Sequence, residues 1–402
     1  EDTRLRFRYI DLRRPEMLGN IRLRHRIAQA MRSVLDERGF LEVETPFLTK
    51  STPEGARDFL VPARLHPGAF YALPQSPQLF KQILMIAGLD KYYQIVRCFR
   101  DEDLRADRQP EFTQLDIEMS FAVERDVMEL TNAIFREICR VAGKPFPDEV
   151  PVLPYAEAVA RYGTDRPDLR FDMELIDIGE VAGRTEFGVF RSALDAGGVV
   201  KCIVVPGGAD MPRSTTDGLA EFAKQFGAKG LANTKVAEGG KVETGIAKFV
   251  SPVAEALLEA TGAGPGDILF FAADKAEVVH RVLGEIRLKV ARERGLIDES
   301  RFEWCWVTDF PLAEWSEEDG RRYSLHHPFT SPKPEHLDRL ETDPGSVLSR
   351  AYDIVLNGNE LAGGSIRIHS PEVQARIFKL LGISDEQARE RFGFFLDALQ
   401  YG

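Results

Sequence analysis

The sequence predicts an α+β fold, in which an antiparallel sheet is flanked by helices and a second α/β domain is inserted. Residues 92–100 and 112–121 form a long hairpin, whose second strand alternates apolar with polar side chains. Residues 170–290 hold 17 of the 33 glycines in under a third of the chain, and this shift in composition marks the insertion. Asn357-Gly358 is a strong signal for the turn of a further hairpin.

Other elements follow from apolar periodicity and from residues that start or stop helices. Residues 21–38 are predicted to form an amphipathic helix, and residues 40–45 a short strand. Ser76 is expected to cap a helix that has Pro77 in its first turn and ends at Gly88. In residues 112–121 the apolar set runs to Phe121, so that Leu115, Ile117, Met119 and Phe121 are expected to point the same way.

The length of 402 residues favours two or three domains rather than one. We expect the first part of a core over residues 1–165, the inserted domain over residues 166–298 and the second part of the core over residues 299–402. Hydrophobic residues make up 44% of the chain, enough to bury a sizeable core in each part.

Composition also bounds the class of protein. The first turn is charged, which argues against a signal peptide, and no apolar run is long enough to span a bilayer. The four cysteines lie far apart without metal-site spacing, so we expect a reduced, cytoplasmic protein. A net charge of −12 argues mildly against a nucleic-acid partner. The basic stretch at residues 22–26 is either a phosphate contact or a solvated helix face.

The charged end of the long hairpin is the first candidate for chemistry. There is no GxxxxGK[ST] or GxGxxG phosphate loop, so if ATP binds here, the protein must hold it in another way. Arg100 ends the first strand, where its planar fork can grip a phosphate. Phe112 can stack on a base, while Glu102 and Gln109 can hydrogen-bond it or the polar groups beside it. The alternative is a charged hairpin held by its own ion pairs.

A helix and a later strand supply more candidates. Gln78 and Lys81 are three residues apart and share one helix face, whereas their apolar neighbours can pack on the other. The alternative for Lys81 is a solvated surface lysine. Arg367 alternates with two isoleucines and so faces away from the core. The pair His326-His327 is a poor metal site alone, and a structural role is its alternative.

Two carboxylates in the second hairpin form a candidate metal site. A two-residue turn at Asn357-Gly358 places Asp353 diagonal to Glu360 on one face, roughly 7–8 Å apart. Two such carboxylates repel unless a cation lies between them, and Mg²⁺ carried by ATP phosphates suits few protein ligands and several waters. The alternative is a pair of solvent-facing acids on an exposed sheet.

Several strings resemble a known family. Residues 99–116 resemble motif 2 of class II aminoacyl-tRNA synthetases, and the segment around Pro46 resembles motif 1, which forms the dimer interface in that class. Residues 39–57 (GFLEVETPFLTKSTPEGAR) and 74–82 (PQSPQLFKQ) are similar to the bacterial aspartyl-tRNA synthetases in particular. The insertion resembles the extra domain typical of the bacterial enzymes.

This resemblance implies that the protein activates L-aspartate with ATP and transfers it to tRNA(Asp). It also implies a homodimer that does not associate with a membrane. Lys81 would reach the side-chain carboxylate of aspartate, Arg367 would clamp it and the loop of Glu54 would close over the amino group. Arg100 would be the catalytic residue, at the α-phosphate. The implied aspartate-binding residues are Glu54, Ser76, Gln78, Lys81, Arg100, Asp116, His326 and Arg367. The implied ATP-binding residues are Arg100, Glu102, Gln109, Phe112 and Glu360, with Mg²⁺ on Asp353 and Glu360.

Two parts of the family pattern are not found in the sequence: the N-terminal anticodon-binding domain and the C-terminal motif 3. The sequence does not begin with Met, and we expect it to start inside a longer protein. Two alternatives therefore stay open, a non-catalytic fragment and a tRNA-independent ligase that activates aspartate. The sequence also leaves open whether tRNA(Asn) is charged, since part of that choice lies in the anticodon domain.

Overall fold

A computed structural model describes residues 1–51, 56–103 and 108–401. The chain divides into two compact units. Unit 1 comprises residues 1–148, 310–352 and 364–402, and unit 2 comprises residues 149–309 and 353–363. The chain thus leaves unit 1 twice, once for the long middle segment and once for the tip of a hairpin.

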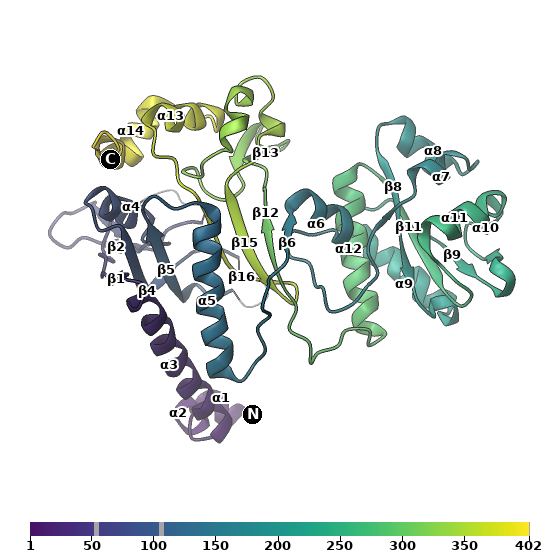
Figure 1. Cartoon of the computed structure of the whole chain (residues 1–402), viewed down its shortest axis with the longest axis horizontal. Coiled ribbons are helices and arrows are strands. Elements are labelled where there is room, and N and C mark those ends of the chain that lie inside the picture. The colour runs from purple at the N-terminus through teal and green to yellow at the C-terminus, as the bar shows by residue number, and fades with distance from the viewer. Residues whose placement is uncertain (52–55, 104–107, 402) are drawn as a thin grey trace. The chain divides into compact units, whose positions relative to one another are not determined.

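Unit 1 is built on a three-stranded sheet with helices against it, as Figure 1 shows. Its strand order is β1-β4-β5, with β1 parallel to β4 and β4 antiparallel to β5. The elements of the first segment are α1 (Asp2–Arg6), α2 (Arg8–Asp11), α3 (Pro15–Asp36), β1 (Leu41–Glu42), β2 (Leu60–Pro62), β3 (Phe70–Ala72), α4 (Gln78–Ile86), β4 (Lys91–Phe99), β5 (Glu111–Met119) and α5 (Glu124–Ala142). The later elements are β13 (Ala313–Ser316), β14 (Arg321–Ser324), α13 (Pro371–Leu380) and α14 (Asp385–Ala398).

The long hairpin, β4 and β5, forms most of the sheet of unit 1. Lys91 pairs with Met119 at one end and Phe99 with Glu111 at the other, which confirms the predicted hairpin. Its apolar face packs against helices α3 and α5 in one core, formed by Val34, Leu35, Phe40, Tyr93, Leu130 and Ile134 with Leu115, Ile117 and Met119 against them. The polar face of β5 is therefore turned the other way, toward α4.

Local signals explain where the helices of unit 1 begin and end. Helix α3 begins earlier than predicted because Pro15 fits its first turn, where a backbone N–H is not needed. Helix α5 ends at Gly143, whose φ of 67° is the left-handed conformation that glycine adopts readily. The prediction that Ser76 caps α4 was wrong, because the helix starts one residue later and Pro77 holds the cap position.

Phe121 also departs from the prediction. The strand ends at Met119, and the chain turns with Phe121 at a φ of 57° and 98% exposed. The backbone N–H of Ser120 donates to the carbonyl of Asp90, which closes the turn at 2.8 Å. The apolar alternation of the sequence continues to Phe121, but the strand ends at Met119, so the predicted direction of the Phe121 side chain was wrong.

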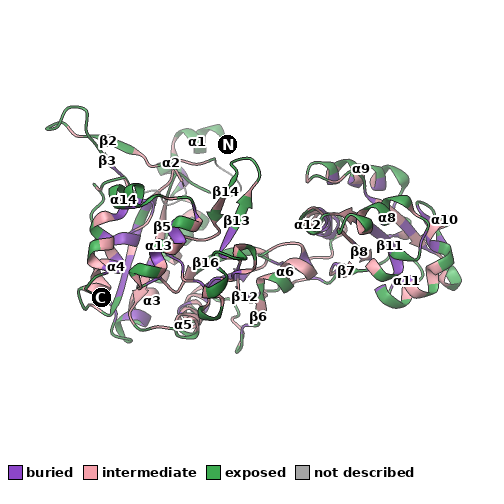
Figure 2. Ribbon diagram, turned by 90° about the horizontal axis from the view of Figure 1, so that it is seen from above, coloured by how far each residue is buried: buried purple, intermediate pink, exposed green. Residues whose placement is uncertain are grey.

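Unit 2 contains a five-stranded antiparallel sheet with the order β10-β9-β11-β8-β7. In Figure 2 its central strands are among the most buried parts of the chain. Its elements are β7 (Ile176–Asp177), α7 (Gly179–Gly183), α8 (Gly188–Asp195), β8 (Val199–Val205), α9 (Arg213–Lys224), β9 (Ala232–Val236), β10 (Val242–Glu243), α10 (Ala247–Val250), α11 (Ala254–Thr261), β11 (Ile268–Asp274) and α12 (Ala276–Glu293). Helices α9 and α12 cover one face and α7, α8, α10 and α11 the other, so that two hydrophobic cores form. Both cores lie within the range 166–298 predicted for the insertion.

A second sheet, with the order β16-β15-β12-β6, lies mostly in unit 2, with the first residues of β15 and the last of β16 in unit 1. Its elements are β6 (Val152–Pro154), α6 (Tyr155–Tyr162), β12 (Trp304–Thr308), β15 (Ala351–Leu356) and β16 (Asn359–Ser365). Unit 2 starts at Glu149, before the predicted boundary of the insertion, because β6 pairs with β12 in this sheet. The hairpin β15–β16 turns at Asn357 and Gly358, both with positive φ, as the sequence predicted.

One buried cation fixes the start of the insertion. Arg287 on α12 is 1% exposed, and its guanidinium lies 3.9 Å from the centre of the Phe171 ring. It donates hydrogen bonds to the backbone carbonyls of Asp168, Phe171, Asp172 and Met173. Burial lowers the pKa of Arg287 to about 10, which still leaves it charged near neutral pH.

Candidate active site

A buried lysine lies between α4 and the polar face of β5 in unit 1. Lys81 is 6% exposed, and its Nζ lies 2.7 Å from Asp116 Oδ1 and 3.3 Å from Glu118 Oε2. Burial by itself lowers the pKa of Lys81, but the two carboxylates outweigh that effect and raise it above its usual value. Lys81 is therefore a buried, ion-paired group, and the alternative of a solvated surface lysine is wrong.

The same helix meets an arginine from the C-terminal part of unit 1. Arg367 donates from Nη2 to Gln78 Oε1 at 2.7 Å and from Nη1 to Ser365 Oγ at 2.8 Å. Ser365 in turn shares a 3.0 Å hydrogen bond with Thr330. Two side chains, Gln78 and Ser365, therefore hold the guanidinium, and the fold brings together Gln78 and Arg367, which the resemblance assigned to one site.

His327 lies near Lys81 and Arg367. Together with Gln78, Asp116 and Glu118 these residues form the amino-acid cluster. The backbone N–H of Phe329 donates to His327 Nδ1 at 3.1 Å, so the ring proton of neutral His327 is on Nε2. Burial and then the positive charges of Arg367 and Lys81 hold the pKa of His327 well below its usual value. The ring is thus a neutral donor near neutral pH. His326 packs instead against Phe310, with ring centres 4.4 Å apart.

Three polar atoms of this cluster lack a hydrogen-bond partner in the described part of the chain. Asp116 Oδ2, His327 Nε2 and Arg367 Nε are buried and have no hydrogen-bond partner among the described residues. A buried polar group without a partner costs free energy, so such atoms in one place indicate a ligand. The cluster offers one acceptor, for a cationic group, and donors for an anionic group.

Sequence reasoning missed part of this cluster. Glu118 was predicted to share the strand face of Asp116 but was not assigned to the site, although the same alternation was signal enough. His327 was considered only through the resemblance of the His326-His327 pair to one that contacts aspartate, with His326 alone assigned, and Ser365 was not assigned to the site. Their contacts to the cluster come from the tertiary fold, for which a single sequence has no local signal.

The charged end of the long hairpin has a different arrangement. The guanidinium of Arg100 lies over the ring of Phe112, 5.0 Å from its centre, and Arg108 contacts Glu102 at 3.3 Å. Gln109 is exposed. These residues are adjacent across the hairpin, as predicted, and the ring of Phe112 already has a planar partner on one face. The ion pair between Arg108 and Glu102 also agrees with the alternative of a charged hairpin, so these contacts alone do not assign a ligand.

The candidate metal residues lie in unit 2. Asp353 is 8% exposed, and its Oδ1 lies only 2.2 Å from the position that a Cβ on Gly363 would occupy. Glu360 Oε1 lies 3.4 Å from the same position. The two carboxylates therefore converge over a glycine that leaves room for them. Among residues 1–51, 56–103 and 108–401, no group of three or more His, Cys, Asp or Glu side chains is placed to hold a metal ion.

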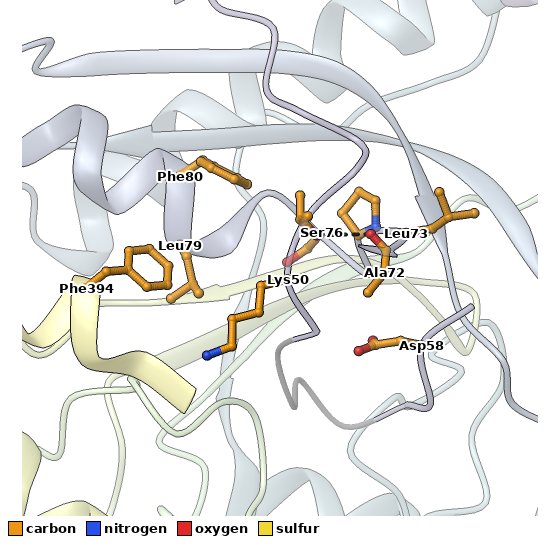
Figure 3. A pocket seen from close by; sticks show the side chains of 10 residues that line it. Lys50, Asp58, Ala72, Leu73, Ser76, Leu79, Phe80 and Phe394 are labelled. Carbon is orange, nitrogen blue, oxygen red and sulfur yellow. Dashed lines mark hydrogen bonds between the residues drawn. The ribbon is translucent and has the colours of Figure 1, made fainter. Parts of the chain in front are cut away.

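Ser76 borders a cavity of about 130 Å³ (Figure 3). The lining is mainly apolar and includes Leu79 of α4 and Phe394 of α14. Lys50 extends along it and donates to the carbonyl of Glu390 at 2.6 Å. Glu54, which was assigned to the substrate amino group, lies outside the described residues.

Comparisons with known proteins bear on this geometry. The family of class II tRNA synthetases for D, K and N matches residues 1–402, the whole chain. The chain belongs to the class II aminoacyl-tRNA synthetases. The synthetase is 54% identical to the aspartate–tRNA(Asp/Asn) ligase of Syntrophomonas wolfei subsp. wolfei and 54% identical to the aspartate–tRNA ligase of Enterococcus faecalis. It is 55% identical to the aspartate–tRNA ligase of Macrococcus caseolyticus.

These matches cover 100% of this chain and 68–69% of each relative's length. They confirm that the protein is an aminoacyl-tRNA synthetase with the predicted arrangement of antiparallel sheets and helices. Its family uses ATP. In the described parts of the synthetase, no helix combines the length and the apolar character required to cross a membrane. No disulfide joins its four buried cysteines.

Proposed function

We propose that the synthetase activates L-aspartate with ATP and transfers it to tRNA(Asp). The observation that carries the proposal is a pair of cations, the buried Lys81 and the partly buried Arg367, in the cluster that also holds the carboxylate of Asp116. Names of relatives at 53–55% identity support the same substrate. Buried charged groups whose polar atoms lack hydrogen-bond partners reduce stability, so a protein without a ligand for them would gain nothing by keeping them.

The charges of the cluster match those of aspartate. In this proposal the side-chain carboxylate of the substrate accepts hydrogen bonds from Lys81 and Arg367, and His327 Nε2 donates to a further oxygen. The ammonium group donates to Asp116 Oδ2, an acceptor without a partner among the residues that the structure describes. Asparagine would offer Lys81 and Arg367 a neutral amide in place of a carboxylate, and a site built for a charged group rejects the neutral analogue strongly. Ser76 and His326 are also proposed to bind aspartate, as the resemblance implies.

The reaction follows in two steps. An oxygen of the aspartate α-carboxylate bonds to the α-phosphorus of ATP, the bond from that phosphorus to the bridging oxygen breaks, and pyrophosphate leaves. The 3′-terminal hydroxyl of tRNA then attacks the carbonyl carbon of the adenylate, loses its proton and releases AMP. No side chain forms a covalent bond, so catalysis comes from position and charge. Arg100 stabilises the charge that builds on the α-phosphate, and Glu102, Gln109 and Phe112 hold the adenine end.

Asp353 and Glu360 would hold Mg²⁺. Two converging carboxylate oxygens are hard donors that suit this ion, which keeps several waters when few protein ligands are present. When bound, the ion would neutralise phosphate charge. Gly363 has the role of leaving space for the two carboxylates, because any side chain there would displace Asp353.

The synthetase is proposed to be a homodimer that meets its partner at the segment around Pro46. Leu41, Phe47 and Leu48 flank this proline with exposed apolar side chains. Exposed apolar side chains that lie together indicate a protein interface. Sedimentation would give a dimer mass, and Phe47→Glu would lower it toward the monomer. A monomeric wild-type protein with unchanged activity would contradict this assembly. The cysteines, buried without a disulfide, agree with a cytoplasmic location.

Amino-acid-dependent exchange of pyrophosphate into ATP tests the proposed function. We expect exchange with L-aspartate and a kcat/KM for asparagine lower by about 10⁴-fold. Charging of tRNA(Asp) and tRNA(Asn) transcripts with aspartate would then decide whether both are substrates. Equal exchange with aspartate and asparagine would rule out the assigned pocket, and exchange with neither would favour the non-catalytic alternative.

A further inference from the structure

An ion pair outside the amino-acid cluster joins α5 to the C-terminal part of unit 1. Arg350 donates from Nε to Glu124 Oε1 at 2.7 Å and from Nη2 to Glu124 Oε2 at 2.6 Å. Such a two-point contact fixes both the distance and the orientation of the guanidinium. The side chains are only 21% and 31% exposed, so solvent screens this pair less than a surface pair. Glu124 also opens a 19-residue helix that packs in the core of the unit.

The backbone of Arg350 lies in the middle of a three-segment contact. Its N–H donates to the carbonyl of Ser331 at 2.9 Å, and its carbonyl accepts the N–H of Ile366 at 3.0 Å. Ser331 and Ile366 are joined directly, since the N–H of Ser331 donates to the carbonyl of Ile366 at 2.8 Å. Arg350 therefore holds both the segment that follows His327 and the segment that precedes Arg367.

The second of these segments carries the pocket arginine. Ile366 lies between Ser365 and Arg367, which are themselves hydrogen-bonded, and Arg367 forms a bridge with Thr330 in the other segment. A shift of the backbone at Ile366 would thus move the guanidinium relative to Gln78. Helix α5 provides the fixed reference, because its first residue is tied to Arg350 while its apolar face is packed against α3 and the sheet.

We propose that Glu124 and Arg350 are positioning residues that set the place of Arg367 and thereby the affinity and selectivity for aspartate. This inference rests on the proposed function, since it takes Arg367 as a ligand of the substrate carboxylate. Neither residue touches the cluster itself in the described contacts. Their effect passes through the backbone of Arg350 and Ile366, and a small displacement of a group that grips substrate is costly in rate or affinity.

A second ion pair on α5 has no such connection among the described contacts. Arg125 and Glu129 form a 2.7 Å pair on the same helix α5, but both side chains are largely exposed. The pair is local to the helix surface, so it should contribute little to stability. It therefore supplies a matched control for removal of a carboxylate charge from α5.

The test compares Glu124→Gln with Glu129→Gln in aspartate-dependent pyrophosphate exchange. Glutamine keeps the shape of the side chain but removes the charge that orients Arg350. We expect Glu124→Gln to raise KM for aspartate about tenfold, to leave KM for ATP within about twofold and to reduce the ratio of kcat/KM for aspartate over asparagine. Glu129→Gln should behave as the wild type. Loss of folded protein alone would lower the apparent kcat and leave both KM values and the ratio unchanged.

A double-variant comparison tests the route through Arg350. If Glu124 acts through Arg350, the variant carrying Glu124→Gln and Arg350→Gln should raise KM for aspartate no more than the larger single effect. Arg350→Lys keeps the charge without the two-point contact, so an intermediate KM is expected, and it serves if Glu124→Gln fails to fold. Additive effects, or folded Glu124→Gln with the wild-type KM and selectivity, would overturn the inference. Wild-type protein that does not use aspartate would instead overturn the proposed function.

Discussion

Replacement of Lys81 by methionine is the perturbation whose outcome the structure defines best. Methionine has a similar length and no charge, so the change removes the cation and little volume. Lys81 is 6% exposed and contacts Asp116 and Glu118, which would then face each other without a counter-charge. Breaking a buried pair in this way costs about 3–5 kcal/mol of stability.

The effect on catalysis is separate from the effect on stability. The substrate carboxylate would lose one hydrogen bond to a charged group, worth about 1.5–3 kcal/mol, which corresponds to about 10- to 150-fold in kcat/KM. The approach of that carboxylate to Asp116 and Glu118 would add repulsion, so this range is a lower bound. Selectivity for aspartate over asparagine should fall by a similar factor, because only the charged substrate used the cation.

The assay is pyrophosphate exchange at saturating ATP, corrected for the concentration of folded protein by thermal unfolding. Adding Asp116→Asn to Lys81→Met should restore part of the stability and none of the aspartate usage. Lys379→Met on the exposed side of α13 is the control and should match the wild type. A folded Lys81→Met protein with kcat/KM and selectivity within about twofold of the wild type would refute the reasoning.

Four further predictions concern other groups. Arg100→Lys should lower the adenylation rate by about 10²-fold in single-turnover measurements, since it removes a planar donor from the α-phosphate; unchanged rates would give Arg100 a structural role only. Gly363→Ala should raise the Mg²⁺ concentration needed for half-maximal exchange, because its Cβ would lie 2.2 Å from a carboxylate oxygen. His327→Asn should flatten the loss of unfolding free energy between pH 6.5 and 5, measured by urea titration, since the lowered pKa means that acid protonates the unfolded state first. Arg287→Met should cost about 3 kcal/mol or more of unfolding free energy, whereas Arg281→Met on the exposed side of the same helix should cost little.

Local periodicity placed several residues of the cluster on shared faces, whereas their assignment to an aspartate pocket came from the resemblance to the synthetase family. The alternation in β5 placed Asp116 and Glu118 on one face, and the helical spacing of Gln78 and Lys81 placed both on the face of α4 that meets it. Asn357 with the glycine that follows it defined the second hairpin for the same reason. Each of these patterns is complete within a few residues, so the sequence carries it directly.

The remaining features depend on segments that meet only in the fold. His327 and its histidine neighbour are equivalent in the sequence, and only the fold separates the one beside Arg367 from the one beside Phe310. The pair of Glu124 and Arg350 joins residues from separate segments without any shared motif. Such contacts are set by which elements pack together, and single-sequence periodicity does not encode that choice.

The most direct test of the central claim is a crystal structure of the synthetase with a non-hydrolysable aspartyl-adenylate analogue. The account predicts that the side-chain carboxylate of the analogue lies within hydrogen-bond distance of both Lys81 Nζ and the Arg367 guanidinium, with its ammonium group at Asp116 Oδ2. A bound analogue whose side-chain carboxylate contacts neither cation would contradict it.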